Sequence, residues 1–96
     1  MIILISYDLN EHENIEDYEK LIDVIRSTAG EGNYAKPLYS QWFVDTNLSI
    51  HQWNNILKDA TDNNDSRMII EIVRRPVGKY NKPAITWINE RLTEYY

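Results

Sequence analysis

The opening of the chain is its most constraining feature. Residues 1–8 read MIILISYD, and the first five are apolar without a break. A continuous apolar run of this length is typical of a strand whose two faces are both covered. We therefore predict a central strand over residues 2–7. Asp8 follows where that strand ends, so its carboxylate emerges at the start of a turn.

Length and composition indicate a single domain covering residues 1–96. Hydrophobic residues make up 43% of the 96 residues and aromatic residues 11%, which favours a packed core over a disordered chain. The sequence contains no cysteine, so disulfides, thiolate metal sites and cysteine nucleophiles are excluded. The opening apolar run has no basic leader and is too short for a signal peptide or a membrane span. We therefore expect a cytoplasmic protein with no membrane association.

The rest of the chain alternates between helical and strand patterns. Ser49 and Gln52 have the spacing of a capping box, so a helix is expected to begin directly after Ser49. Asn81 and Pro83 are typical of the start of a last helix. Proline cannot donate a hydrogen bond within a sheet, so Pro37 restricts its segment to a bent or edge strand. In chain order, the sequence predicts a helix over 15–28, a strand over 34–39, a strand over 40–46, a helix over 50–60, a strand over 67–74 and a helix over about 82–95.

This order predicts an α+β fold, a ferredoxin-like βαββαβ sandwich with an additional C-terminal helix. Right-handed crossovers would place the strands at 2–7 and 67–74 side by side in the centre of the sheet. The strand at 40–46 is apolar on both faces, because Trp42 and Val44 share one face and Phe43 lies on the other. A second apolar face needs a cover, so we expect either a homodimer or a third packed helix.

Asp8 is the first candidate for a catalytic and metal-binding residue. Its strand-end carboxylate is a hard oxygen ligand of the kind that Mg²⁺ prefers. The alternative is an aspartate that caps the turn after the strand. Glu11, Glu13 and Asp45 either join Asp8 in a metal site or form a solvated acidic surface. The histidines at positions 12 and 51 lack the spacing of a shared metal site.

Cationic side chains concentrate around the last predicted strand and the start of the last helix: Arg67, Arg74, Arg75, Lys79 and Lys82. Among these, Arg74, Arg75 and Lys79 are candidate nucleic-acid contacts, with Tyr80 or Trp87 stacking on bases. The alternative is that the charges keep the end of a strand soluble. Ten basic against fifteen acidic side chains give a net charge of −5, which weighs against a broad phosphate-binding surface.

Several of these features together resemble a known family. The pattern consists of LISYDLN at 4–10, a tyrosine and a Leu-Ile pair in the first helix, SQWFV at 40–44, and Asn64-Asp65 before an apolar strand. It is similar to small proteins of the CRISPR-associated Cas-two and SinR families. The resemblance spans roughly residues 3–73 as a spaced pattern. Its most specific parts are Tyr7-Asp8 and the Ser40 strand.

The resemblance implies a ferredoxin-like fold and a homodimer that brings two sheets together. For the catalytically active members it implies a Mg²⁺-dependent endonuclease, with Asp8 of each protomer as the catalytic residue and metal ligand at the dimer interface. Tyr7 and Ser40 match residues beside that site and are candidate nucleic-acid contacts. Other members serve as structural dimers in spacer integration. The chain departs from the family in its acidity, and in a final helix where the family typically has a strand exchanged between protomers.

Two functions are therefore carried forward. The first is a dimeric metal-dependent hydrolase that cleaves or processes nucleic acid, with Mg²⁺ as cofactor. The second is a non-catalytic dimeric scaffold or protein-interaction module with the same fold. The sequence contains no P-loop, dinucleotide fingerprint, Ser-His-Asp order or zinc spacing, so no other cofactor is expected.

Overall fold

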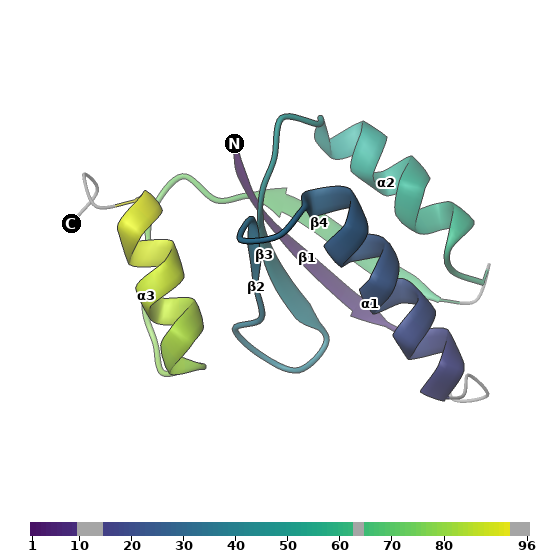
Figure 1. Ribbon diagram of the computed structural model, residues 1–96, viewed down its shortest axis with the longest axis horizontal. Helices are drawn as coiled ribbons and strands as arrows, with labels where there is room; N and C mark the ends of the chain where they lie inside the picture. The colour runs from purple at the N-terminus through teal and green to yellow at the C-terminus, as the bar shows by residue number, and fades with distance from the viewer. Residues whose placement is uncertain (10–14, 63–64, 93–96) are drawn as a thin grey trace.

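Within residues 1–9, 15–62 and 65–92, which the computed structural model describes, the chain forms one four-stranded antiparallel sheet and three helices. The architecture is α+β (Figure 1). No helix in these described ranges is long and apolar enough to cross a membrane. The elements in chain order are β1 (Ile2–Asp8), α1 (Ile15–Ala29), β2 (Tyr34–Ala35), β3 (Gln41–Asp45), α2 (Ile50–Asp59), β4 (Ser66–Glu71) and α3 (Lys82–Arg91).

The sheet has the strand order β2-β3-β1-β4, and all neighbouring strands are antiparallel. β1 lies between β3 and β4, which confirms the central strand predicted from the opening apolar run. β4 adjoins β1 as predicted, but its predicted place in the centre is wrong because it forms an edge. It also ends at Glu71, earlier than the predicted 67–74. The apolar run that suggested a central strand is partly solvent-exposed: Met68, Ile70 and Val73 are 61%, 45% and 56% exposed.

One face of the sheet, which we call the inner face, is covered by α1 and α2 (Figure 1). Side chains of β1 and β3 that alternate onto this face pack against apolar side chains of both helices. As predicted, Trp42 and Val44 share this face, whereas Phe43 lies on the other. The buried members of this core are Ile3, Ile5, Tyr7, Leu9, Leu21, Ile25, Trp42, Val44, Trp53 and Leu57.

The ends of the two inner helices follow the local sequence signals. The Ser49 hydroxyl accepts a hydrogen bond from the Gln52 N–H at 3.1 Å, and the Gln52 side chain accepts one from the Ser49 N–H at 2.8 Å. These two bonds confirm the predicted capping box at the start of α2. At the end of α1, Gly30 adopts φ 89°, a left-handed conformation that glycine tolerates and that stops the helix.

The third helix packs on the other face of the sheet, which we call the outer face. A second core forms there from Ile2, Phe43, Ala84, Ile88 and Leu92. The Phe43 ring stacks on Trp87, with centroids 6.2 Å apart and planes at 6°. A third packed helix was one of the two expected covers, and it covers part of the outer face.

The start and end of α3 differ in detail from the prediction. Asn81 occupies the N-cap position as expected, but its side chain makes no capping hydrogen bond. Pro83 lies within the first helical turn as predicted. The helix ends at Arg91, and residues 93–95 of the predicted range lie outside the described residues.

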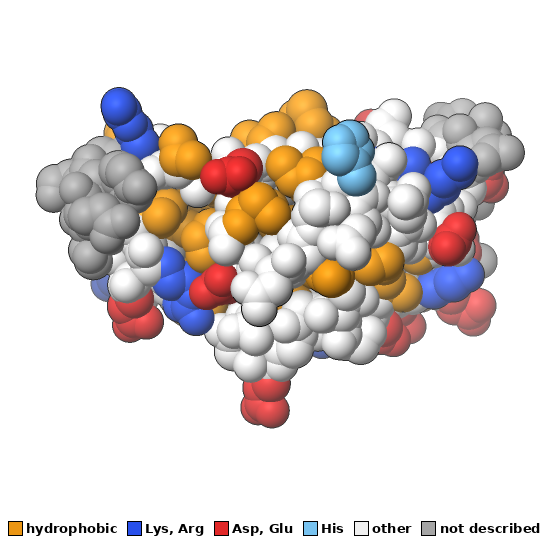
Figure 2. Space-filling view, turned by 90° about the horizontal axis from the view of Figure 1, so that it is seen from above, with side chains coloured by type: hydrophobic (Ala, Val, Ile, Leu, Met, Phe, Trp, Pro, Cys, Tyr) orange, Lys and Arg blue, Asp and Glu red, His pale blue; other side chains and the backbone are white. Residues whose placement is uncertain are grey.

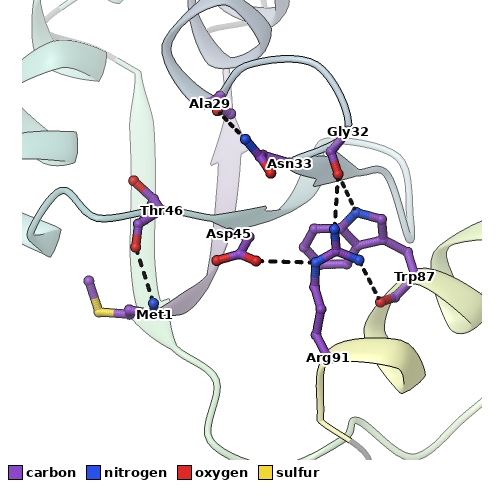
Figure 3. A network of polar contacts seen from close by, with 8 residues as sticks. All are labelled: Met1, Ala29, Gly32, Asn33, Asp45, Thr46, Trp87 and Arg91. Carbon is purple, nitrogen blue, oxygen red and sulfur yellow. Dashed lines mark hydrogen bonds and ion pairs between the residues drawn. The ribbon is translucent and has the colours of Figure 1, made fainter.

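A polar network fastens the end of α3 beside β2 and β3 (Figure 3). Arg91 donates through Nε to Oδ2 of Asp45 at 3.3 Å and through Nη2 to the Gly32 carbonyl at 3.0 Å. The Trp87 indole N–H donates to the same carbonyl at 3.0 Å. At the neighbouring strand end, the amino group of Met1 donates to the Thr46 carbonyl at 3.1 Å. α3 is therefore held on the β2–β3 side of the outer face.

Candidate functional site

Asp8 lies at the last position of β1, with its side chain on the outer face. Tyr7 points into the inner core, and successive strand residues alternate between faces. Asp8 is exposed and stands opposite Ser66 at the start of β4. A shallow hollow of about 170 Å³ beside it is lined by Ser6, Tyr7, Asp8, Ser66, Arg67 and Met68. The carboxylate therefore faces solvent at the end of the outer face that α3 leaves open.

Tyr7 is a buried group on the opposite face from Asp8. Its hydroxyl accepts a hydrogen bond from Nε1–H of Trp42 at 3.2 Å. Burial raises the pKa of the Tyr7 phenol and outweighs the opposite effect of the Trp42 hydrogen bond. The structure thus places this predicted nucleic-acid contact in the core, with its side chain turned away from the surface that carries Asp8.

Ser40 lies beside this end of β1 through main-chain contact. Its carbonyl accepts a hydrogen bond from the Tyr7 N–H at 3.1 Å. Ser40 adopts φ 62°, a left-handed conformation that is uncommon for a residue with a side chain. The structure therefore brings together Tyr7, Asp8 and Ser40, which carry the most specific part of the family resemblance.

Two of the predicted basic contacts, Arg74 and Arg75, lie toward the opposite end of β1 from Asp8. The Ile72 N–H donates to the Ile2 carbonyl at 2.8 Å, so the chain leaves the sheet beside the start of β1. Arg74 and Arg75 follow that point, at a distance along the strand of about 20 Å from Asp8, given a rise of about 3.3 Å per residue. In the face shown in Figure 2, basic and acidic side chains are interspersed. The structure therefore does not gather these arginines and Asp8 into one site.

The aromatic side chains proposed to stack on bases already have ring partners. Trp87 stacks on Phe43, and the Arg91 guanidinium lies 3.9 Å from the Trp87 ring centroid. Tyr80 meets Phe43 edge-on, with centroids 6.0 Å apart. A base that stacked on Trp87 would have to replace one of these contacts, which fasten α3 to the sheet.

The acidic set predicted as a metal site is not assembled by the described residues. Asp45 pairs in register with Ile2, at the opposite end of β1 from Asp8, and it binds Arg91. Glu11 and Glu13 lie outside the described residues. Within the described ranges, no group of three or more acidic, histidine or cysteine side chains lies close enough to hold a metal ion. Asp8 thus offers one carboxylate, and Mg²⁺ is commonly held by one or two with water or phosphate oxygens.

A second feature of the outer face was not predicted from the sequence. The segment after β4 crosses back over the sheet and leaves a hollow of about 340 Å³. Its lining is mainly apolar and includes Leu4, Phe43, Ile70 and Val77, with Lys79 among the polar residues. The sequence signal was the pair Pro76 and Gly78, which marks a break but does not say where the following residues return.

No protein-family model matches this chain, and no curated protein is significantly similar to it.

Proposed function

We propose that this chain is a non-catalytic, ferredoxin-like sheet module that functions as a dimer with a second copy of itself. The strand order supports the ferredoxin-like assignment, because a split βαβ arrangement requires β1 to lie between β3 and β4. A fold of this kind supports many functions. The choice among them therefore comes from the surface that the fold leaves exposed.

The observation that carries this proposal is the exposed apolar surface on the β4 side of the outer face. Met68 and Ile70 project from β4 at 61% and 45% exposure, and Val77 in the following segment is 89% exposed. Ile70 and Val77 also line the apolar hollow next to the sheet. Neighbouring exposed apolar side chains of this kind are typical of a protein-binding surface. We call the group formed by Met68, Ile70 and Val77 the open apolar surface.

Sedimentation equilibrium over a concentration series tests the dimer. We expect a mass of two 11.4 kDa chains for the wild type. Ile70→Glu should weaken association at least about tenfold, because it places a charge in an apolar contact at a cost above about 1.4 kcal/mol. Ile15→Glu is the matched control, since Ile15 is 74% exposed on α1, away from the open apolar surface. A single-chain mass at every concentration would overturn the proposal.

A second candidate is metal-dependent cleavage of nucleic acid, favoured by the exposed carboxylate of Asp8 on the outer face. In this candidate, Asp8 from each of two protomers would hold Mg²⁺. The bound ion would activate water and stabilise charge on the phosphate. Arg74, Arg75 and Lys79 would contact the phosphate backbone. This function requires a dimer in which the two outer faces meet near Asp8.

A nuclease assay with Mg²⁺ separates the two candidates. If the protein is an enzyme, Asp8→Asn should lower the cleavage rate at least about a hundredfold, since the metal supplies several kcal/mol of transition-state stabilisation. Asp59→Asn, which changes an exposed aspartate at the end of α2, is the matched control and should keep full activity. Wild-type protein that is inert on single- and double-stranded substrates, or equal activity of Asp8→Asn, would contradict the enzymatic function.

A further inference from the structure

The free edge of β4 is open to another strand. β4 is the last strand of the sheet and pairs only with β1 among the described residues. Its sequence, SRMIIE, contains no proline or lysine, which are residues that often protect an exposed edge. It does contain Arg67 and Glu71, and charges on an edge strand often serve to prevent pairing. The arrangement of these two charges therefore decides what the edge can bind.

The hydrogen bonding between β1 and β4 fixes which backbone groups face outward. The Ile72 N–H bonds to the Ile2 carbonyl, and this pair continues the register of Ile3 with Glu71. Hydrogen-bonded and non-bonded pairs alternate along an antiparallel ladder. The backbone groups of Arg67, Ile69 and Glu71 therefore point away from β1. These three residues are the ones whose N–H and C=O groups can pair with an added strand.

The charge pattern on these three residues is self-complementary. When β4 pairs antiparallel with a second β4 and Ile69 stands opposite Ile69, each Arg67 stands opposite a Glu71. Opposite charges across neighbouring strands are stabilising and like charges are destabilising. Shifting the register to pair Arg67 with Arg67, or Glu71 with Glu71, would oppose like charges. The side chains thus favour one register among those that the backbone allows.

The surroundings of the two charged residues suit this register. Both lie on the inner-face side of β4, because Arg67 pairs with Tyr7 and Glu71 with Ile3. The Nε–H of Arg67 donates to Oδ1 of Asn54 on α2 at 2.8 Å, which holds the side chain beside the strand. Glu71 is exposed and can meet the arginine of another copy.

The same register pairs the exposed apolar side chains. On the outer face, each Met68 would stand opposite an Ile70 of the other copy, in a non-hydrogen-bonded pair with a Cα separation of about 4.5 Å. Their side chains, which are 61% and 45% exposed in the single chain, would then contact one another across the two strands. The outward backbone groups, the charge pairs and the apolar pairs therefore all favour the same alignment of the two β4 strands.

We infer that β4 is the dimerisation strand: it pairs antiparallel with β4 of a second copy about a two-fold axis at Ile69. This inference rests on the dimer proposed above and names its interface. The pairing joins two four-stranded sheets edge to edge into one continuous sheet. The interface is isologous, because the same residues contribute from both copies.

This geometry also bears on Asp8. Asp8 pairs with Ser66, three residues along β4 from the two-fold axis. With strands about 4.8 Å apart and a rise of about 3.3 Å per residue, the two Asp8 residues would lie roughly 25 Å apart. A dimer of this form therefore does not create a metal site shared by two Asp8 carboxylates.

A charge-swap experiment tests the register. Arg67→Glu and Glu71→Arg each place like charges opposite one another at both ends of the paired strands. Each variant alone should self-associate at least about tenfold more weakly than wild type. An equimolar mixture should form a heterodimer, since each new charge then meets its opposite, and the double variant R67E/E71R should dimerise like wild type. Sedimentation velocity with one variant labelled measures all four cases.

Single cysteines provide a second measurement that does not depend on charge. The sequence has no cysteine, so an introduced one can form a disulfide only between copies. Ile69→Cys should crosslink, because the paired Cα atoms would lie about 5.5 Å apart, within the disulfide range. Ile70→Cys is the matched control. Ile70 is exposed but would lie about 8 Å from its symmetry mate, so it should crosslink much less.

The outcomes separate this inference from the proposed function. If wild type is a single chain at every concentration, both fail. If wild type is a dimer that Ile70→Glu disrupts, yet both charge variants dimerise normally and Ile70→Cys crosslinks as well as Ile69→Cys, the register is wrong and the dimeric module stands. Heterodimer formation with selective crosslinking at Ile69 supports the inference.

Discussion

The two parts of the outer face carry similar apolar residues with different environments. Phe43 of β3 and Ile70 of β4 both lie on this face, yet Phe43 is 3% exposed and Ile70 is 45% exposed. The difference is α3, which packs over β3 and leaves β4 uncovered. Burial of a strand residue thus depends on which element reaches it, as well as on its own hydrophobicity. The covered part stabilises the chain, and the open part is available for association.

The size and anchoring of α3 explain this division. A helix of ten residues is about 15 Å long and, with side chains, about 10 Å wide, so it covers only part of a four-stranded sheet. Arg91 and Trp87 hold it at Gly32 and Asp45, beside β2 and β3. The β4 side therefore stays open, and a second copy of the chain paired beside β4 is the partner that we propose.

Truncation of Phe43 should have the largest effect in this comparison. Phe43→Ala removes the ring between the sheet and α3 and should cost about 3–5 kcal/mol of unfolding free energy, from lost burial and a cavity. Val77→Ala, at a site that is 89% exposed, is the control and should change the free energy by less than about 0.5 kcal/mol. Urea unfolding of the single chain, at a protein concentration below that at which it associates, measures both. Equal effects would remove the distinction between the covered and open parts.

Tyr7 and Asp8 allow a smaller, sharper comparison between the inner face and the open part of the outer face. Tyr7→Phe leaves the buried Trp42 N–H without its acceptor, which should cost about 1–3 kcal/mol. Asp8→Asn changes an exposed side chain and should cost less than about 0.5 kcal/mol.

The pH dependence of the same pair gives an independent check. Because burial raises the pKa of Tyr7 in the folded chain, the unfolded chain loses this proton first. The contribution of Tyr7 to the free energy of unfolding is complete below the pKa of about 10 that a tyrosine has in an unfolded chain. It is lost as pH rises through the pKa of Tyr7 in the folded chain. Wild type should therefore lose more stability than Tyr7→Phe between neutral pH and about pH 11. Urea unfolding at a series of pH values measures this difference. If wild type and Tyr7→Phe lose the same unfolding free energy over this pH range, Tyr7 is not the group responsible for the pH dependence.

Local sequence signals were sufficient for most of the elements. The apolar opening run and the Ser49 capping box each act within a few residues, and the structure has β1 and the start of α2 where they were expected. The place of β4 was predicted less well. Apolar character alone did not distinguish a strand covered on both faces from an edge strand with an open apolar surface.

The candidate site was predicted only in part. The sequence singled out Tyr7, Asp8 and Ser40, and the structure brings them together. It also singled out Arg74 and Arg75, which lie about 20 Å from Asp8 along the strand. The sequence shows that Arg74 and Arg75 follow an apolar strand, but it does not show at which end of the sheet that strand finishes. The end is set by the direction of β4 relative to β1.

The sequence by itself determined the order of the helices and strands and that Trp42 and Val44 share a face opposite Phe43, because hydrophobic periodicity and capping act over short distances. The predicted strand over 34–39 was too long, since β2 contains only Tyr34–Ala35. Only the tertiary structure decided that β4 forms an edge, that α3 covers one part of the outer face, and that Asp8 emerges on the open part. Those outcomes depend on contacts between residues far apart in the chain. The apolar opening strand organises the sheet, and the exposed edge of β4 beside it, not the carboxylate of Asp8, is the surface proposed for self-association.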